Sequence, residues 1–293
     1  MKRRMLAVFL LLALALSGCG GRETYAQIAA TTAPVYDFTT RLCEGTGLTV
    51  TRLVTEQVSC LHDYSLSVRQ VKAAEAAEIV VISGAGLEEF LEGVIDEAKA
   101  IDASDGVALL TPEEHHHEED HDHEGHHHEV DPHIWLSPEN AKIMAQNICR
   151  GLGEQYPQHR AQMEDNLTAL LADLDALQAY GEKTLETLSC RELITFHDGF
   201  SYLARAYGLT ILEAVEEESG SEASARELKH LIEEVARHDL PAIFTEVSGS
   251  VSAAGVIARE TGAKVFPLDM AMAGDSYFAA MYHNIHTLKE ALG

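Results

Sequence analysis

Histidine and carboxylate side chains, which bind transition-metal ions, are concentrated in one stretch of the chain. Residues 113–138 (EEHHHEEDHDHEGHHHEVDPHIWLSP) hold nine of the sixteen histidines and nine carboxylates, and no Lys or Arg interrupts them. Imidazole and carboxylate groups are common ligands of Zn²⁺ and related cations. The last part of the stretch, from Asp131 to Pro138, has the composition of ordered structure. We therefore predict a metal-attracting tract that leads directly into an ordered metal site at His133.

Four potential metal ligands occupy the same kind of position, because each follows a predicted β-strand. They are His62 after the strand at 48–54, His133 after the strand at 107–110 and the tract, His197 after the strand at 192–196, and Asp269 after the strand at 264–268. Parallel sheets bind ligands beyond the carboxyl ends of their strands. Two of the four residues come from each half of the chain, so an ion bound by all of them would be held from both sides.

Taken alone, a histidine at a strand end is more often a hydrogen-bonded structural residue than a ligand. The recurrence of the position favours ligation, and so do the neighbouring carboxylates, because a carboxylate that accepts the other ring N–H is the usual support of a ligating imidazole. These carboxylates are Asp63, Asp131 and Asp198, each one or two residues from a histidine. For the fourth ligand we choose Asp269. Glu246, at the end of a predicted strand at 241–246, is held in reserve, and a water molecule is a third option.

Hydrophobic patterning places these residues on two α/β halves. Residues 24–110 alternate strand and helix patterns, and the apolar run at 78–82 is typical of a strand buried on both faces of a parallel sheet. The second half repeats this order. The predicted fold class is α/β, with a four-stranded parallel sheet flanked by helices in each lobe. The predicted divisions are an N-terminal lobe at 24–156 that includes the tract at 113–129, a linking helix at 157–188, and a C-terminal lobe at 189–293.

Leucines recur at helical spacing from Pro157 to Leu188, which predicts a helix of roughly 48 Å at 1.5 Å per residue. Only Gly181 weakens the pattern. A helix of this length between two lobes is expected to act as a stiff connector. Within the first lobe we also expect a helix at Leu87–Ala98 and the fourth strand at Val107–Leu110.

The first residues have the pattern of a targeting signal. Lys2, Arg3 and Arg4 precede an apolar run of twelve residues, which is too short to span a bilayer as an ordinary helix. The sequence LSGC that ends at Cys19 resembles the bacterial lipobox, in which cleavage precedes the cysteine and its thiol is lipidated. We therefore expect residues 1–18 to be a signal peptide and Cys19 to carry a lipid anchor outside the cytoplasmic membrane.

The net charge is strongly negative, at −26 with histidines neutral. Such a field repels nucleic acid and attracts cations, although salt screens it within about 10 Å. The composition therefore predicts no nucleic-acid partner, and we expect a monomer. Exported proteins form disulfides, but the spacing of the remaining cysteines selects no pairing and leaves free thiols equally open. They are Cys43, Cys60, Cys149 and Cys190.

At these residues the chain resembles a known family, the zinc- and manganese-binding solute-binding lipoproteins of ABC importers (the ZnuA-like group of cluster A-I). The similarity extends over nearly all of the chain after the signal. The matching segments are His62-Asp63-Tyr64, AEIVVISGAGL at 77–87, DPHIWLSP at 131–138, TFHDGFSY at 195–202, and Gly274 to Tyr277 with Asn284.

This resemblance implies that His62, His133, His197 and Asp269 are the metal ligands, and that two four-stranded lobes are bridged by one rigid helix. It also implies an ABC permease with its ATPase as partners, and zinc as the transported ligand. In the family, histidine at the position of His197 accompanies zinc and glutamate there accompanies manganese. Three imidazoles and one carboxylate independently suit tetrahedral Zn²⁺, whereas Mn²⁺ prefers more oxygen.

Manganese binding, zinc-dependent hydrolysis and cell adhesion are the alternatives to zinc capture. A manganese-binding member of the same family is the nearest alternative. A zinc hydrolase would need an open coordination position and a general base, and no H-E-x-x-H motif is present. Related lipoproteins have been described as cell-adhesion proteins, but no residue pattern here indicates a partner surface. The tract is interpreted as a loop that binds accessory metal ions weakly, rather than as a solvated loop whose metal binding is incidental. The histidines that would bind these ions are His115, His116, His117, His121, His123, His126, His127 and His128.

Overall fold

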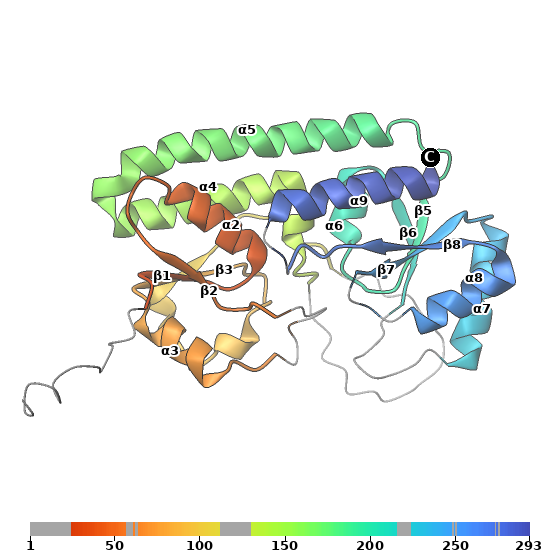
Figure 1. Ribbon diagram of the computed structural model, residues 1–293, viewed down its shortest axis with the longest axis horizontal. Coiled ribbons are helices and arrows are strands. Elements are labelled where there is room, and N and C mark those ends of the chain that lie inside the picture. Colours follow the sequence, from red (N-terminus) through yellow and green to blue (C-terminus); the bar gives the residue numbers. More distant parts are fainter. Residues whose placement is uncertain are drawn as a thin grey trace, which may run out of the picture.

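The computed structural model describes residues 25–56, 61, 64–111, 130–215, 224–247, 249, 251–272, 274 and 276–293. These residues form two lobes, each built on a four-stranded parallel sheet (Figure 1). The first sheet contains β1 (Ile28–Ala30), β2 (Val50–Arg52), β3 (Ile79–Ile82) and β4 (Ala100–Asp102). The second contains β5 (Glu192–Thr195), β6 (Thr210–Ala214), β7 (Ala242–Glu246) and β8 (Lys264–Leu268). The spatial orders, β2-β1-β3-β4 and β6-β5-β7-β8, are the same when each sheet is numbered from its own first strand.

Helices cover both faces of each sheet. The outer face of the first sheet is covered by α3 (Val68–Ala76), and that of the second by α7 (Ala225–Arg237) and α8 (Ser252–Thr261). The inner face of the first sheet contacts α2 (Ala33–Leu42) and α4 (Pro138–Gln155). The inner face of the second sheet contacts α6 (Ser201–Ala206) and α9 (Tyr277–Leu292). Helix starts follow the sequence closely, because Ser67 and Ser224 each form a capping box with the residue three positions on, Gln70 and Glu227. The fold class predicted from the sequence is confirmed.

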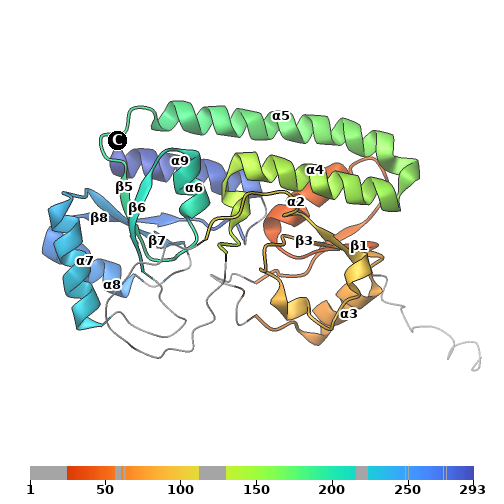
Figure 2. The ribbon, with the colours of Figure 1, turned by 180° about the vertical axis from the view of Figure 1, so that it is seen from behind.

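One long helix, α5 (Arg160–Leu185), runs along both lobes, as both views show (Figures 1 and 2). It packs on α2 (Ala33–Leu42) and α4 (Pro138–Gln155) of the first lobe and on α9 (Tyr277–Leu292) of the second. The buried apolar side chains beneath it form one continuous cluster that reaches both sheets. Relative rotation of the lobes would open this shared core, so the helix layer resists it.

The segment after β8 makes further contacts across the two lobes. The indole Nε1 of Trp135 donates to the carbonyl of Met270 at 2.7 Å, and the hydroxyl of Tyr277 donates back to the carbonyl of Trp135 at 2.8 Å. The backbone N–H of Tyr277 donates to Asp37 on α2 at 2.9 Å, and a guanidinium N–H of Arg52 donates to the carbonyl of Gly274. These contacts hold Met270, Gly274 and Tyr277 of the second lobe against the first.

Two elements of the first lobe differ from the sequence prediction. The helix expected at Leu87–Ala98 is replaced by two short 3₁₀ turns, Glu89–Leu91 and Glu97–Lys99, because Gly93 adopts a left-handed backbone conformation with φ of +70°. The fourth strand lies at Ala100–Asp102, where it pairs with β3, and no strand forms at Val107–Leu110. Only Val107 of the run at 107–110 is buried, and Leu109 is 40% exposed, so the apolar pattern there marked neither a strand nor a buried segment.

Three of the cysteines are described, and all three are free thiols. Cys43 and Cys149 are buried in the shared core, and Cys190 is partly buried. Cys60, Cys19 and the predicted signal peptide lie outside the described residues. No helix of the described ranges is both long and apolar enough to cross a membrane.

Gly181, which weakened the predicted helix pattern, packs so closely on the ring of Tyr207 that a larger side chain would clash with it. A Cβ added there would lie 2.3 Å from Cε1 of the Tyr207 ring, whereas a Cβ on Gly255 of α8 would meet nothing nearer than an Arg259 nitrogen at 3.7 Å. We expect Gly181→Ala to destabilise the protein by about 1–3 kcal/mol through overpacking. The matched change Gly255→Ala should stabilise it by about 0.4–1 kcal/mol. Thermal unfolding of the two variants measures this, and equal stabilisation by both would contradict the contact.

Candidate metal centre

His133 lies between the first sheet and α4, immediately before a 3₁₀ turn at Ile134–Leu136. Its side chain is buried, with 4% exposed. Oδ1 of Asp131 accepts from the backbone N–H of His133 at 2.9 Å and lies 2.9 Å from its ring Nδ1. A carboxylate only accepts, so Nδ1 carries a proton, and in the neutral ring the lone pair then lies on Nε2. The ring is thus fixed in the tautomer that a metal ligand requires.

His197 follows β5, two residues beyond the end of that strand. Its ring Nδ1 lies 3.0 Å from Oε1 of Glu246, the buried last residue of β7. The pairing of β5 with β7 aligns Thr195 with Phe244, which brings His197 and Glu246 to the same level at the carboxyl edge of the sheet. Nε2 of His197 is buried and has no hydrogen-bond partner. A buried nitrogen lone pair left without a donor is suited to a cation.

The imidazoles of His133 and His197 come from different lobes and lie close together, with the edge of one ring toward the face of the other. Their ring centroids are 5.3 Å apart, and the planes are inclined by 84°. Gly199 allows this approach, because a Cβ there would lie 2.7 Å from Cδ2 of His197 and 3.0 Å from Cε1 of His133. The terminal methyl of Met270 would be 2.6 Å from the same Cβ. Met270 therefore closes one side of the histidine pair.

Asp269 comes directly before Met270, at the end of β8. Asn284 of α9 holds its backbone on both sides, because Oδ1 of Asn284 accepts from the Asp269 N–H and Nδ2 donates to the Asp269 carbonyl, each at 2.7 Å. One carboxylate oxygen accepts from the N–H of Ala271 at 2.8 Å. Asp269 is partly buried. Its backbone is thus fixed next to the residue that contacts the histidine pair.

Glu246, the reserve ligand, is engaged with Nδ1 of His197. The same carboxylate can orient the imidazole while the imidazole binds an ion through Nε2. The sequence reasoning missed this use of Glu246, because the two residues come from different strands. The register of β5 and β7 would have revealed it.

His62 and the eight tract histidines lie outside the described residues, so the structure does not place them. Leu61, which precedes His62, is buried, and its carbonyl accepts from the N–H of Tyr64 at 3.1 Å. Within the described ranges no group of three or more His, Cys, Asp or Glu side chains is gathered as a metal site. The described part of the centre is the pair formed by His133 and His197.

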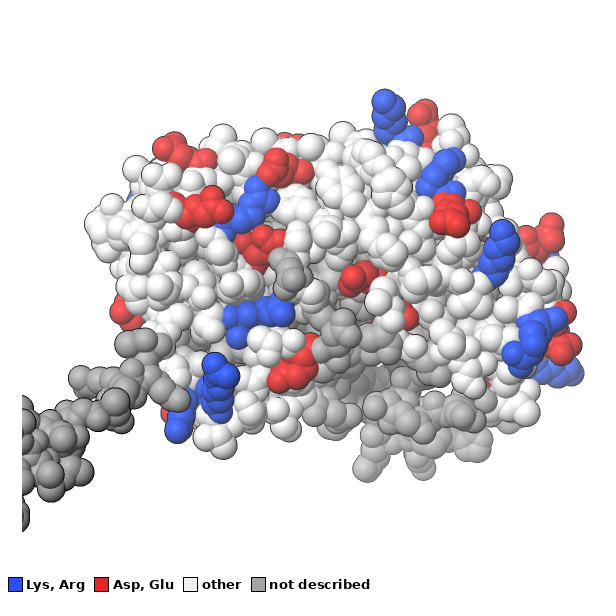
Figure 3. Space-filling model, viewed as in Figure 1, with Lys and Arg blue, Asp and Glu red and all other residues white. Residues whose placement is uncertain are grey.

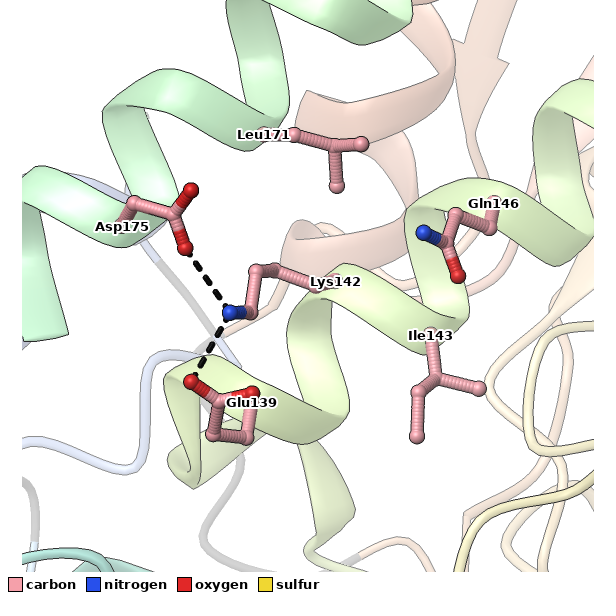
Figure 4. A pocket seen from close by; sticks show the side chains of 6 residues that line it. All are labelled: Glu139, Lys142, Ile143, Gln146, Leu171 and Asp175. Carbon is pink, nitrogen blue, oxygen red and sulfur yellow. Dashed lines mark hydrogen bonds and ion pairs between the residues drawn. The ribbon is translucent and has the colours of Figure 1, made fainter.

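A surface hollow of about 370 Å³ between α4 and α5 contains none of the predicted ligands. Figure 4 shows Nζ of Lys142 between the carboxylates of Glu139 and Asp175, at 2.8 Å from each. Lys142 thus pairs with both carboxylates, and the hollow contains no imidazole or thiol that would favour a transition-metal ion. Figure 3 shows acidic and basic side chains interspersed over the described part of one face, without the continuous basic area that binds nucleic acid.

Two parallel-sheet lobes bridged by a long helix, with one histidine of a buried pair from each lobe, define a two-lobed α/β protein with a candidate metal site between the lobes. The model of the ZnuA family, described as the periplasmic component A of the zinc-uptake complex, matches residues 28–291. The chain belongs to this family.

Two solved structures share the fold. A crystal structure of ZnuA has a TM-score of 0.77 and 30% identity, and the match covers 92% of this chain and 99% of that one. A deletion mutant of ZnuA with zinc bound has a TM-score of 0.75 and 30% identity, with the same coverage. The zinc-binding lipoprotein AdcA of Streptococcus pneumoniae serotype 4 is 31% identical over 308 aligned residues. That match covers 99% of this chain but only 61% of AdcA, so the chain spans about three-fifths of its relative's length.

The pKa of His197 reflects its opposing surroundings. Burial lowers the pKa, but the hydrogen bond and charge of Glu246 and the charges of Asp198 and Asp131 raise it, and the balance lies above the usual 6.5. A His pKa raised by folding stabilises the metal-free protein fully below pH 6.5, and this contribution is lost as pH rises through the raised value. Protons and a metal ion would compete for Nε2 over the same range.

We expect Glu246→Gln to lower the pKa of His197, because it removes the charge that outweighs burial. Titration of the His197 ring signals by NMR in metal-free protein measures this. The wild type should titrate above pH 6.5 and the variant below the wild type. The matched change Glu213→Gln, which removes a carboxylate 3.2 Å from His230 instead, should leave His197 unaffected. An unchanged His197 pKa in Glu246→Gln would contradict the assigned contact.

Proposed function

We propose that this protein captures Zn²⁺ between its lobes outside the cytoplasmic membrane and delivers it to an ABC permease. The observation that carries the proposal is the pair of imidazoles that face each other from different lobes, each with a carboxylate at Nδ1. Membership of the ZnuA family supports it. Zinc is cargo here, because it is bound and released rather than kept for chemistry.

The proposed ligands are His62, His133, His197 and Asp269. Three imidazole nitrogens and one carboxylate oxygen match the tetrahedral preference of Zn²⁺. Mn²⁺ favours a site richer in oxygen, and it also stands low in the Irving–Williams order for nitrogen ligands. The carboxylates at Nδ1 increase the basicity of both rings and strengthen binding to Zn²⁺ further.

The remaining parts of the proposal concern access and location. The tract histidines, which precede Asp131, are proposed to collect zinc weakly and raise its concentration beside the primary ligands. A lipid on Cys19 is proposed to hold a monomeric protein at the membrane surface, near the permease and its ATPase. The lobes joined by α5 and the shared core are proposed to deliver the ion through local movement around the ligands rather than wide opening.

A zinc hydrolase is the alternative from a different class. It would need a coordination position open to water and a general base beside it. The carboxylates described at the histidines, Asp131 and Glu246, contact Nδ1 atoms on the side of each ring opposite to Nε2. They support the imidazoles and are not placed to activate a metal-bound water. Binding without catalysis is therefore the favoured function.

The proposed site predicts strong preference for zinc over manganese. Competition titration of the metal-free protein with a chromophoric chelator should give one tight Zn²⁺ site and much weaker Mn²⁺ binding. His133→Ala and His197→Ala should each lower zinc affinity by more than the roughly 10- to 100-fold typical of changes to supporting residues. His159→Ala, in the 3₁₀ turn at Pro157–His159, is the matched control and should bind as the wild type. Equal affinities for the two metals would contradict the assignment.

The tract is predicted to assist zinc capture without forming the primary site. Replacing residues 112–129 by Gly-Gly should leave the affinity of the tight site unchanged and remove the weaker zinc equivalents seen by calorimetry. Growth of a strain carrying this variant should slow only when zinc is scarce. Unimpaired uptake at limiting zinc would rule out the collecting role, whereas loss of the tight site would place primary ligands in the tract.

A further inference from the structure

The hydroxyl of Tyr202 joins segments from both lobes beside the metal centre. Tyr202 is the second residue of α6, five positions after His197, and is 3% exposed. Its oxygen accepts from the backbone N–H of Leu110 at 2.9 Å and donates to the carbonyl of Asp131 at 3.1 Å. Burial raises the pKa of Tyr202, so the phenol keeps the proton that the second bond requires.

Leu110 and Asp131 are also joined directly. The N–H of Asp131 donates to the carbonyl of Leu110 at 2.8 Å. Three hydrogen bonds therefore connect Leu110, Asp131 and Tyr202 in a closed triangle. Leu110 precedes the histidine-rich tract and Asp131 follows it. The triangle therefore fixes the chain positions on both sides of the tract.

Asp131 connects this triangle to the metal centre. Its carbonyl accepts from Tyr202, and its carboxylate accepts from both the backbone and the ring Nδ1 of His133. A shift of the Asp131 backbone would therefore rotate or displace the His133 imidazole. On the other side, Tyr202 is tied through the start of α6 to His197. The Tyr202 hydroxyl thus connects Asp131, which supports His133, to the chain segment that carries His197, and the centroids of the two rings are 5.3 Å apart.

We propose that Tyr202 is a positioning residue that sets the separation and orientation of His133 and His197 through its bond to Asp131. This inference rests on the proposed zinc-binding function. The Tyr202 hydroxyl bonds to backbone atoms of Leu110 and Asp131 rather than to a ligand side chain in the described part of the chain, and it acts through Asp131. Loss of its hydroxyl leaves the Leu110 N–H and the Asp131 carbonyl without this partner, and Asp131 is free to shift with the ring that it holds.

Tyr202→Phe removes the hydroxyl and keeps the ring. Tyr156→Phe is the matched control, because Tyr156 is also buried and its hydroxyl donates to Glu78 at 3.0 Å, before the amino end of β3. We expect Tyr202→Phe to weaken zinc binding by about 10- to 100-fold, the range typical of supporting residues. The visible spectrum of the Co²⁺-substituted protein should also change in intensity and position. The control should reproduce the wild-type affinity and spectrum, even if it loses similar thermal stability.

The same change in the background with residues 112–129 replaced by Gly-Gly separates two routes of action. Persistence of the affinity loss there supports direct positioning of His133 through Asp131. Disappearance of the loss would overturn the proposal, because Tyr202 would then act only through the tract. A wild-type affinity and Co²⁺ spectrum in Tyr202→Phe would overturn it as well.

A measurement on the unaltered protein keeps the proposal testable if the variant folds poorly. Hydrogen exchange of the Leu110 amide should be slow in the zinc-bound wild type, because that N–H is bonded to Tyr202. Rapid exchange would overturn the inference. Failure of the wild type to bind zinc at one tight site would instead refute the proposed function, whereas tight binding by both wild type and Tyr202→Phe would refute only the role of Tyr202.

Discussion

The proposed metal centre depends on two carboxylates that each lie beside the Nδ1 atom of a histidine. Asp131 supports His133 from two residues away in the chain, and Glu246 supports His197 from the neighbouring strand. Each carboxylate lies at Nδ1 and leaves Nε2, on the opposite side of the imidazole ring, directed away from the carboxylate. Nε2 of His197 is buried and has no hydrogen-bond partner, which costs free energy in the absence of an ion. Buried atoms of His197, Asp131 and Glu246 have no hydrogen-bond partner in the metal-free protein, and a bound cation would offset this cost.

The rest of the molecule keeps these two supported rings at a fixed separation. The helix α5 and the core beneath it join the lobes along their length. The segment after β8 adds contacts from Met270 and Tyr277 to the first lobe, next to Asp269. Because the lobes share one core, movement that releases an ion is expected in the residues around the site rather than in the lobes as whole bodies. The residues after β8 join Asp269, a proposed ligand, to the interface between the lobes.

The sequence predicted those features that depend on neighbouring residues or on regular patterns. Strand and helix periodicity predicted the two-lobed α/β fold and the long helix. Neighbouring carboxylates were offered as supports of the histidines, which fits Asp131 at His133, whereas Glu246 lies at Nδ1 of His197. It failed where a backbone conformation or a distant partner decides the outcome. The left-handed Gly93 breaks the helix expected at 87–98, and pairing with β3 selects residues 100–102 rather than 107–110 as the fourth strand. The contacts of Glu246 with His197 and of Tyr202 with Asp131 required the strand register and the meeting of the lobes.

The central claim is that one zinc ion is coordinated by Nε2 of both His133 and His197. A crystal structure of the zinc-loaded protein, with the ion located by anomalous scattering at the zinc edge, tests it most directly. The account predicts a single fully occupied ion at about 2.0–2.1 Å from both Nε2 atoms, with Asp131 and Glu246 still bonded to the Nδ1 atoms. An ion bound elsewhere, or bound to only one of these two histidines, would contradict it.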